Sequence, residues 1–104
     1  MVYVVQDPEG KNILAAKKFG KLEALLPPGQ ITLSPGPSII KLRRKLQKFC
    51  DDDYLLLIGD PIAIALAAMI AGANNTGRVK FLKWDKQERQ YYTVEADIYR
   101  RLHD

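Results

Sequence analysis

Asp53-Tyr-Leu-Leu-Leu-Ile-Gly-Asp-Pro-Ile-Ala-Ile-Ala-Leu-Ala-Ala-Met-Ile-Ala-Gly72 is the stretch of sequence that decides the fold. Residues 55–58 form an unbroken apolar run, which is typical of a strand covered on both faces of a sheet. Gly59, Asp60 and Pro61 then provide a turn, a helix N-cap and a proline at the first helical position. The sequence therefore predicts a buried strand that leads directly into a buried helix.

The composition is that of a single globular domain. The chain has 104 residues, 47% of them hydrophobic, which is enough to bury a core without disulfides or metals. Cys50 is the only cysteine, so no intrachain disulfide or cysteine-based zinc site can form, and a reducing, cytoplasmic setting is expected. We expect no signal peptide and no membrane span, because the apolar run over residues 61–73 is too short to cross a bilayer.

The amino-terminal quarter is predicted to form strands. Residues 2–5 are apolar and largely β-branched and end at a turn-forming cluster. Residues 13–19 and 22–26 flank Gly20, which can supply the positive φ of a tight turn, so strand–turn–strand is the preferred interpretation. A helix over residues 12–26 is the alternative, although a glycine in its middle would cost about 1 kcal/mol.

The rest of the chain alternates strands and helices. Residues 31–33 predict a short strand, and the amphipathic helix that follows has its apolar residues at three- and four-residue steps, at Ile39, Leu42, Leu46 and Phe49. Residues 78–84 and 91–98 predict a terminal hairpin. Its last strand alternates, with an inward set of Tyr92, Val94, Ala96 and Ile98 and an outward set of Tyr91, Thr93, Glu95 and Asp97.

The order of elements predicts an α/β fold. Helical crossovers join parallel strands by right-handed connections, which here implies a parallel core of residues 31–33, 55–58 and 79–84. The predicted architecture is a small two-layer sandwich with a mixed sheet, a parallel β-α-β-α-β core plus antiparallel strands, and two main helices.

Two turns are candidates for a phosphate or nucleotide site. Ligands of open α/β sheets bind beyond the carboxyl ends of parallel strands, near helix N-termini. The residues at those positions are Ser34, Gly36, Ser38, Gly59 and Asp60. The alternative interpretation is that Ser38 and Asp60 only cap helices, since the chain has neither a phosphate-binding loop nor a dinucleotide fingerprint.

A cluster of positive charge is the candidate nucleic-acid or anion site. The formal net charge is +4, and residues 39–49 contain no acid. Several cations in this helix, with others after the second helix, could neutralise phosphates. The predicted set is Lys41, Arg43, Arg44, Lys45, Lys48, Arg78 and Lys80. Exposed Tyr91 and Trp84 could stack on unpaired bases. The competing interpretation is a solvated helix face.

Catalytic and metal chemistry receive little support from the side chains. His103, the only histidine, lies in a charged tail, and Cys50 stands beside acids that would raise its thiol pKa. Three consecutive carboxylates at residues 51–53 point in different directions, which suits a loop better than a cation site. We therefore predict no catalytic residue, metal or cofactor.

One resemblance bears on function. The segment D-D-Y-L-L-L-I-G-D-P, an alanine-rich helix and N-N-x-G-R-V-K-F-L-K-W-D-K-Q-E-R-Q-Y-Y, together residues 51–97, resemble small uncharacterised proteins encoded by bacteriophages. That family carries no assigned activity, so no functional residue is transferred. The resemblance implies an accessory role inside an infected bacterium.

These observations favour a small, soluble binding module over an enzyme. Its expected partner is nucleic acid or a host protein, bound through the basic surface. The alternative is a phosphate- or nucleotide-binding protein or enzyme that uses the two turns. Homo-oligomers are a further expectation, because outer strands such as residues 13–19 or 91–98 leave sheet edges that could pair.

Overall fold

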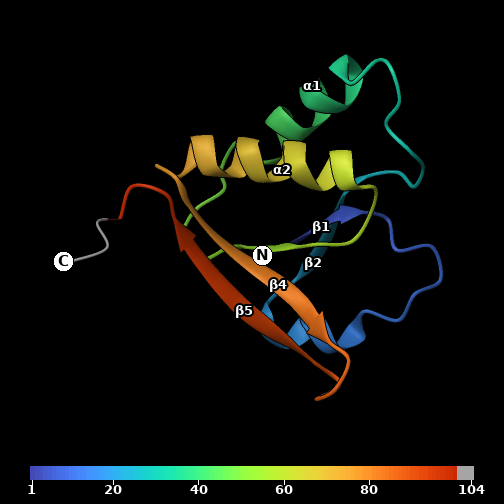
Figure 1. Ribbon diagram of the computed structural model, residues 1–104, viewed down its shortest axis with the longest axis vertical. Coiled ribbons are helices and arrows are strands. Elements are labelled where there is room, and N and C mark those ends of the chain that lie inside the picture. The colour runs from blue at the N-terminus through green and yellow to red at the C-terminus, as the bar shows by residue number, and fades with distance from the viewer. Residues whose placement is uncertain (101–104) are drawn as a thin grey trace.

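A five-stranded mixed sheet forms the centre of the molecule (Figure 1). The computed structural model describes residues 1–100. The strands lie in the order β2-β1-β3-β4-β5, and their bounds are Val2–Gln6 (β1), Leu22–Leu26 (β2), Tyr54–Leu56 (β3), Arg78–Asp85 (β4) and Gln90–Asp97 (β5). β1 to β4 are mutually parallel where they pair, and β5 is antiparallel to β4. The predicted α/β class with a mixed sheet is therefore confirmed.

Two α-helices cover one face of the sheet, α1 (Gly36–Lys45) and α2 (Pro61–Asn74) (Figure 1). α2 begins where the sequence predicts, because the Asp60 carboxylate accepts hydrogen bonds from the amides of Ile62 (3.0 Å) and Ala63 (3.4 Å). Ala63, Ala67 and Ala71, at four-residue steps, are fully buried in the core below the helix. Small side chains on this stripe allow the helix to approach the sheet closely.

The second face of the sheet is covered by a short 3-10 helix, η1 (Leu14–Phe19), so the strand predicted over residues 13–19 is wrong. Ile13, Ala16 and Phe19 recur every third residue, the period of a 3-10 helix, and all three pack into the core on this face. β2 pairs parallel with β1, so η1 is the crossover between them and the predicted hairpin does not exist. Gly20 (φ 147°) instead allows the backbone to lie close to the amino end of the chain. A Cβ atom at this position would lie 3.2 Å from the Met1 nitrogen.

The strand predicted over residues 31–33 is also wrong. This segment is an irregular part of the long connection from β2 to α1, and the Leu33 side chain in it is fully exposed. β1 takes its place in the parallel core, between β2 and β3. None of the side chains of residues 31–33 is fully buried, so a strand here would have no core to pack against.

The burial alternation predicted for the last strand is wrong, because the one buried residue of β5, Tyr91, belongs to the set predicted to point outward. Tyr91 is 7% exposed, whereas Tyr92 and Val94 are 38% and 44% exposed. Tyr92 and Val94 lie on the face that carries the helices, where α2 packs on β4 and β1. Tyr91 is buried on the opposite face, with its ring against Trp84 at 4.9 Å. Ile98 lies beyond β5 and is exposed.

Candidate functional site

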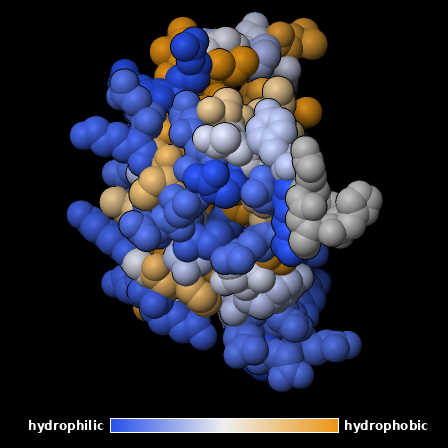
Figure 2. Space-filling model, turned by 90° about the vertical axis from the view of Figure 1, so that its left-hand side faces the viewer, coloured by the Kyte–Doolittle hydropathy of each residue, from blue (hydrophilic) through white to orange (hydrophobic). Residues whose placement is uncertain are grey.

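A hollow of about 500 Å³ opens where β3 and β4 begin and β5 ends, and we refer to it as the strand-end hollow. It lies at the opposite end of the parallel strands from the turns predicted to bind phosphate. Its charged lining contains acids and bases in comparable number, namely Asp51, Asp53, Glu95 and Asp97 with Arg78, Lys80 and Arg100. Figure 2 shows this hydrophilic region at the centre of one face of the molecule.

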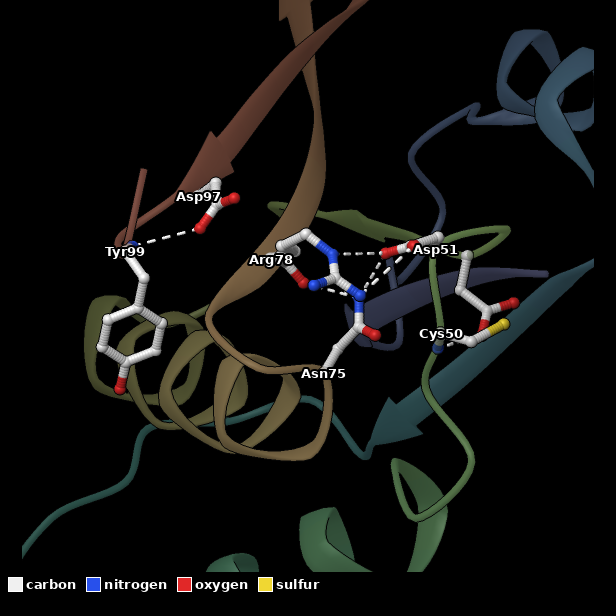
Figure 3. Close-up of polar contacts among 7 residues, drawn as sticks. Cys50, Asp51, Asn75, Arg78, Asp97 and Tyr99 are labelled. Atoms are coloured by element: carbon white, nitrogen blue, oxygen red, sulfur yellow. Dashed lines mark hydrogen bonds and ion pairs between the residues drawn. The ribbon is translucent and has the colours of Figure 1, made fainter. Parts of the chain in front are cut away.

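Two of the three bases of the strand-end hollow, Arg78 and Lys80, are engaged by other side chains of the protein. The Arg78 guanidinium donates to both carboxylate oxygens of Asp51, at 3.0 and 3.3 Å, and the Asn75 amide donates to the same carboxylate at 2.8 Å (Figure 3). The hydrogen bond from Arg78 is the main reason that the pKa of the Asp51 carboxyl is lowered, and the same bond raises the pKa of Arg78. A guanidinium held in this way offers little free charge to an anion.

Lys80 is engaged in a similar way. Its ammonium lies 4.2 Å from the centre of the Tyr54 ring, and Glu95 is its cross-strand partner on β5. Arg78 faces Asp97 in the same ladder. The charges of the strand-end hollow therefore compensate one another, which does not favour an anion-binding site there.

The basic residues predicted on the first helix are arranged differently. Arg43, Arg44 and Lys48 are exposed, while Lys41 is half-buried. Lys45 is also half-buried, and its ammonium donates to the Ala24 carbonyl of β2 at 3.0 Å. None of these helix cations takes part in the two ion pairs found among residues 1–100, which are Met1–Asp53 and Arg78–Asp51. The predicted basic set is thus divided, because Arg78 and Lys80 lie at the strand-end hollow, away from this group.

A second hollow, of about 390 Å³, lies between α1 and the end of α2, and we refer to it as the arginine hollow. It is lined by Ile40, Arg43, Arg44, Gln47 and Asn74. The Asn74 amide donates to the Leu46 carbonyl at 2.9 Å, which ties the end of α2 to α1. Two exposed arginines and an exposed isoleucine therefore line one shallow depression.

The helix layer also exposes apolar side chains that the sequence predicted to be buried. α2 contains no charged residue, yet Ile62 and Met69 on it are exposed, Met69 by 70%, as is Ile40 on α1. Hydrophobic residues are visible at the top of the molecule in Figure 2, where the helix layer lies. A helix that is apolar all round is normally buried on all sides, so these residues mark a surface that could receive a partner.

The turn at Gly59 and Asp60 is organised around Gln6, a residue that sequence reasoning missed. The buried Gln6 side chain accepts a hydrogen bond from the Asp60 amide and donates to the carbonyls of Pro27 (3.0 Å) and Gly29 (2.6 Å). Gly59 adopts φ 134°, and a Cβ atom there would collide with Gln6. The only signal for Gln6 in the sequence is a polar residue that directly follows an apolar strand.

The turn at Ser34, Gly36 and Ser38 leads into α1, whose N-terminus has no side-chain cap. Ser34 and Gly36 are exposed and Ser38 is half-buried. The N-terminal ends of α1 and α2 lie at the same end of the helix layer (Figure 1). Because the Asp60 carboxylate already accepts from two amides of α2, that helix end has fewer donors left for a phosphate. Phosphate binding by these turns stays a prediction.

The remaining candidates yield no site. Within residues 1–100, no group of three or more potential metal-ligating side chains is found, and no helix there is long and apolar enough to cross a membrane. Cys50 is an exposed free cysteine at the rim of the strand-end hollow. His103 lies outside the described residues.

Comparison with protein-family models matches residues 1–98 to the Phage Pam3 gp32-like protein family. The chain belongs to this family. The predicted resemblance to phage proteins is therefore confirmed, and it extends over nearly the whole chain rather than residues 51–97 alone. Searches of curated proteins and of solved structures found no match.

Proposed function

We propose that this phage protein is a non-enzymatic binding module that holds an acidic, partly apolar segment of another protein against the outer surface of its helices. The observation that carries the proposal is the arginine hollow, in which Arg43 and Arg44 surround exposed Ile40. Arginine and apolar side chains are enriched at the centres of protein interfaces, where lysine is depleted. A location in the cytoplasm of the infected cell is part of the same proposal.

The distribution of charge supports a protein partner rather than a duplex. Tight binding to a duplex needs several phosphates to be neutralised by cations of the protein. Here Lys45, Arg78 and Lys80 are engaged within the fold, which leaves the exposed pair Arg43 and Arg44 with Lys48 and half-buried Lys41 as the cations of the helix layer. Ile62 and Met69 add apolar surface on the neighbouring helix, which phosphates would not use.

Fluorescence anisotropy with defined probes tests the proposal. The probes are a labelled 16-residue amphipathic peptide with leucines on one helix face and glutamates on the other, an oligoglutamate of equal charge, and a 16-base-pair DNA duplex. We expect the amphipathic peptide to bind more tightly than the oligoglutamate, because only the peptide can cover Ile40 and Met69. Preference for the duplex, with affinity that falls steeply with salt, would instead support nucleic-acid binding and overturn the proposal.

A matched pair of variants locates the surface. Arg43→Glu with Arg44→Glu should weaken peptide binding about tenfold or more, since interfacial arginines are frequent hot spots. Lys11→Glu with Lys17→Glu makes the same change of net charge at exposed positions on the η1 side of the molecule, and should leave binding nearly unchanged. Equal losses in the two variants would mean that only net charge matters.

The competing hypothesis, a phosphate- or nucleotide-binding protein or enzyme, predicts the opposite pattern. Asp60→Asn with Ser38→Ala would then abolish binding of a labelled nucleotide, while the arginine variants would retain it. Supporting contacts for this hypothesis are few, because Asp60 and Gln6 use the polar groups of the Gly59–Asp60 turn for internal hydrogen bonds.

A further inference from the structure

β5 is an open edge of the sheet. It is the last strand in the order β2-β1-β3-β4-β5, so no strand lies on its outer side among residues 1–100. It is eight residues long, its pairing with β4 runs without a bulge, and it contains neither proline nor lysine. Proteins often block an edge strand with a short length, a bulge, a proline or a lysine, and β5 has none of these four, although Glu95 and Asp97 place charge near its end.

The opposite edge, β2, is protected. It has only five residues, and the carbonyl of Ala24 in its middle accepts a hydrogen bond from the Lys45 ammonium of α1. A short edge strand covered by a helix and a lysine is a poor site for pairing with another chain. Of the two edges, β5 is therefore the one available to a partner.

β5 also exposes apolar side chains next to this edge. Tyr92 and Val94 lie on the face that carries the helices, opposite Lys83 and Phe81 of β4. The adjoining hairpin end carries Arg89, and the other end of the strand carries Glu95 and Asp97. The strand itself thus has acids near one end and an aromatic and a β-branched residue in its middle, and the turn before its other end carries the basic Arg89.

We propose that β5 pairs antiparallel with β5 of a second copy of this chain, about a two-fold axis that passes through Thr93. An axis perpendicular to the sheet keeps every side chain on its own face. Registers centred on Thr93 (residues 90–96) or Val94 (residues 91–97) pair the most strand residues. The two differ in which side chains meet.

The Thr93 register is the one that matches shape best. It places Tyr92 opposite the partner's Val94, and this pair occurs twice because the axis repeats it. Aromatic–β-branched pairs stabilise facing strands. Arg89, in the turn just before β5, then comes near the partner's Asp97 without being part of the strand ladder. The Val94 register places Tyr91 opposite the partner's Asp97 and Tyr92 opposite the partner's Ala96, so neither aromatic ring meets a β-branched side chain.

One strand pair makes a small interface. It buries less than the standard interface of about 1,600 Å², a size class that includes weak, transient associations, so we expect the dimer to form only at high protein concentration. This association uses a different surface from the arginine hollow, and the inference goes beyond the proposed function. Arg43→Glu with Arg44→Glu should therefore leave it unchanged.

Sedimentation equilibrium of the full chain from about 1 to 500 µM tests the association, a range over which weak complexes form and dissociate. The average mass should rise from the 11.8 kDa of the monomer toward twice that value. Val94→Lys should weaken the dimer at least tenfold, because lysine on an edge strand opposes pairing with another chain and the β-branched contact with the partner's Tyr92 is lost. Leu14→Lys, the matched change at an exposed position of η1, should have no effect. A monomer at every concentration would overturn the proposal.

Disulfide trapping tests the register, in a Cys50→Ser background so that no other thiol is present. Thr93→Cys places two thiols opposite each other across the axis, and copper phenanthroline should oxidise them to a reducible covalent dimer. Glu95→Cys separates the thiols by four residues, about 13 Å along the strand, beyond the roughly 7 Å that a disulfide can bridge. Trapping through Val94→Cys instead of Thr93→Cys would refute the Thr93 register, and association without trapping at any of the three positions would refute β5 as the interface.

Discussion

Replacement of Gly59 by alanine should be among the most destabilising single substitutions in this chain. Gly59 has φ 134°, a conformation that L-residues adopt only with strain, at a cost of about 1–3 kcal/mol. A Cβ atom there would also lie 2.9 Å from the Cβ and Cγ atoms of Gln6, and closer still to its side-chain oxygen. Overpacking of this kind typically costs a further 1–3 kcal/mol.

The collision has a second consequence, because Gln6 cannot move without breaking its own hydrogen bonds. Its side chain joins the Asp60 amide to the carbonyls of Pro27 and Gly29, and each such bond contributes about 0.5–1.5 kcal/mol. Together these effects predict a loss of about 3–6 kcal/mol, against a total of roughly 5–15 kcal/mol for a domain of this size.

Urea denaturation followed by circular dichroism measures this loss. With a slope of about 1–1.5 kcal/mol/M, the midpoint of Gly59→Ala should fall by about 2–6 M, to the point where the variant is partly unfolded without urea. Gly29→Ala is the matched control, since Gly29 has φ 122° but open space around its Cβ position. It carries the backbone strain alone and should lose about 1–3 kcal/mol.

A double variant isolates the collision with Gln6. Gln6→Ala removes two of the three atoms that the new Cβ would meet, the side-chain oxygen and Cγ, so Gln6→Ala with Gly59→Ala should be more stable than the sum of the single losses implies, by about 1–3 kcal/mol. The reasoning would be refuted if Gly59→Ala cost no more than Gly29→Ala, or if the two single losses simply added.

Two further predictions concern the ends of the helices and the strand-end hollow. Asp60→Ala should lower stability by about 0.5–2 kcal/mol through loss of the α2 cap, whereas Ser38→Ala should cost little, because α1 has no side-chain cap; equal losses in thermal denaturation would contradict this difference. Asp51→Asn should destabilise the protein near neutral pH but not in acid. The pKa of the Asp51 carboxyl is lowered in the folded state, chiefly by the hydrogen bond from Arg78, so its contribution is present above the usual value of 3.8 and is lost as pH falls through the lowered value. The urea midpoints of wild type and variant should therefore converge in acid, and a difference between the midpoints that stays constant with pH would argue against an ionic contribution. Because Asp51 is exposed, the difference in stability should be small and should shrink in salt.

The segments whose structure was predictable carry their own local signals. The strand and α2 on either side of Gly59 combine an apolar run, a turn glycine, a capping aspartate and a first-turn proline, and all of these act within a few residues of one another. The strand predicted over the segment from Leu14 to Phe19 was wrong because the apolar residues there recur every third position. This period lies between those of a strand and an α-helix. Reading that period correctly would have turned a predicted hairpin into a crossover.

The candidate surface was only partly predictable, because the positions of basic residues in the sequence do not show which of them are engaged by other groups in the fold. Lys45, Arg78 and Lys80 look as basic as Arg43 and Arg44, but their partners Ala24, Asp51 and Tyr54 come from elements distant in the chain. The role of Gln6 is hidden for the same reason, since its contacts at Gly29 and Asp60 are 23 and 54 residues away.

The sequence by itself determined the α/β class, the start of α2 and the existence of a terminal hairpin, because periodicity, capping and turn residues act over a few neighbouring positions. The tertiary structure alone decided that β2 runs parallel to β1, that α2 leaves β5 uncovered, and which basic side chains remain free. These features depend on which elements meet in space. The alternating residue types of β5 indicate that the two faces of the strand differ. Only the position of the helices determines which face is buried.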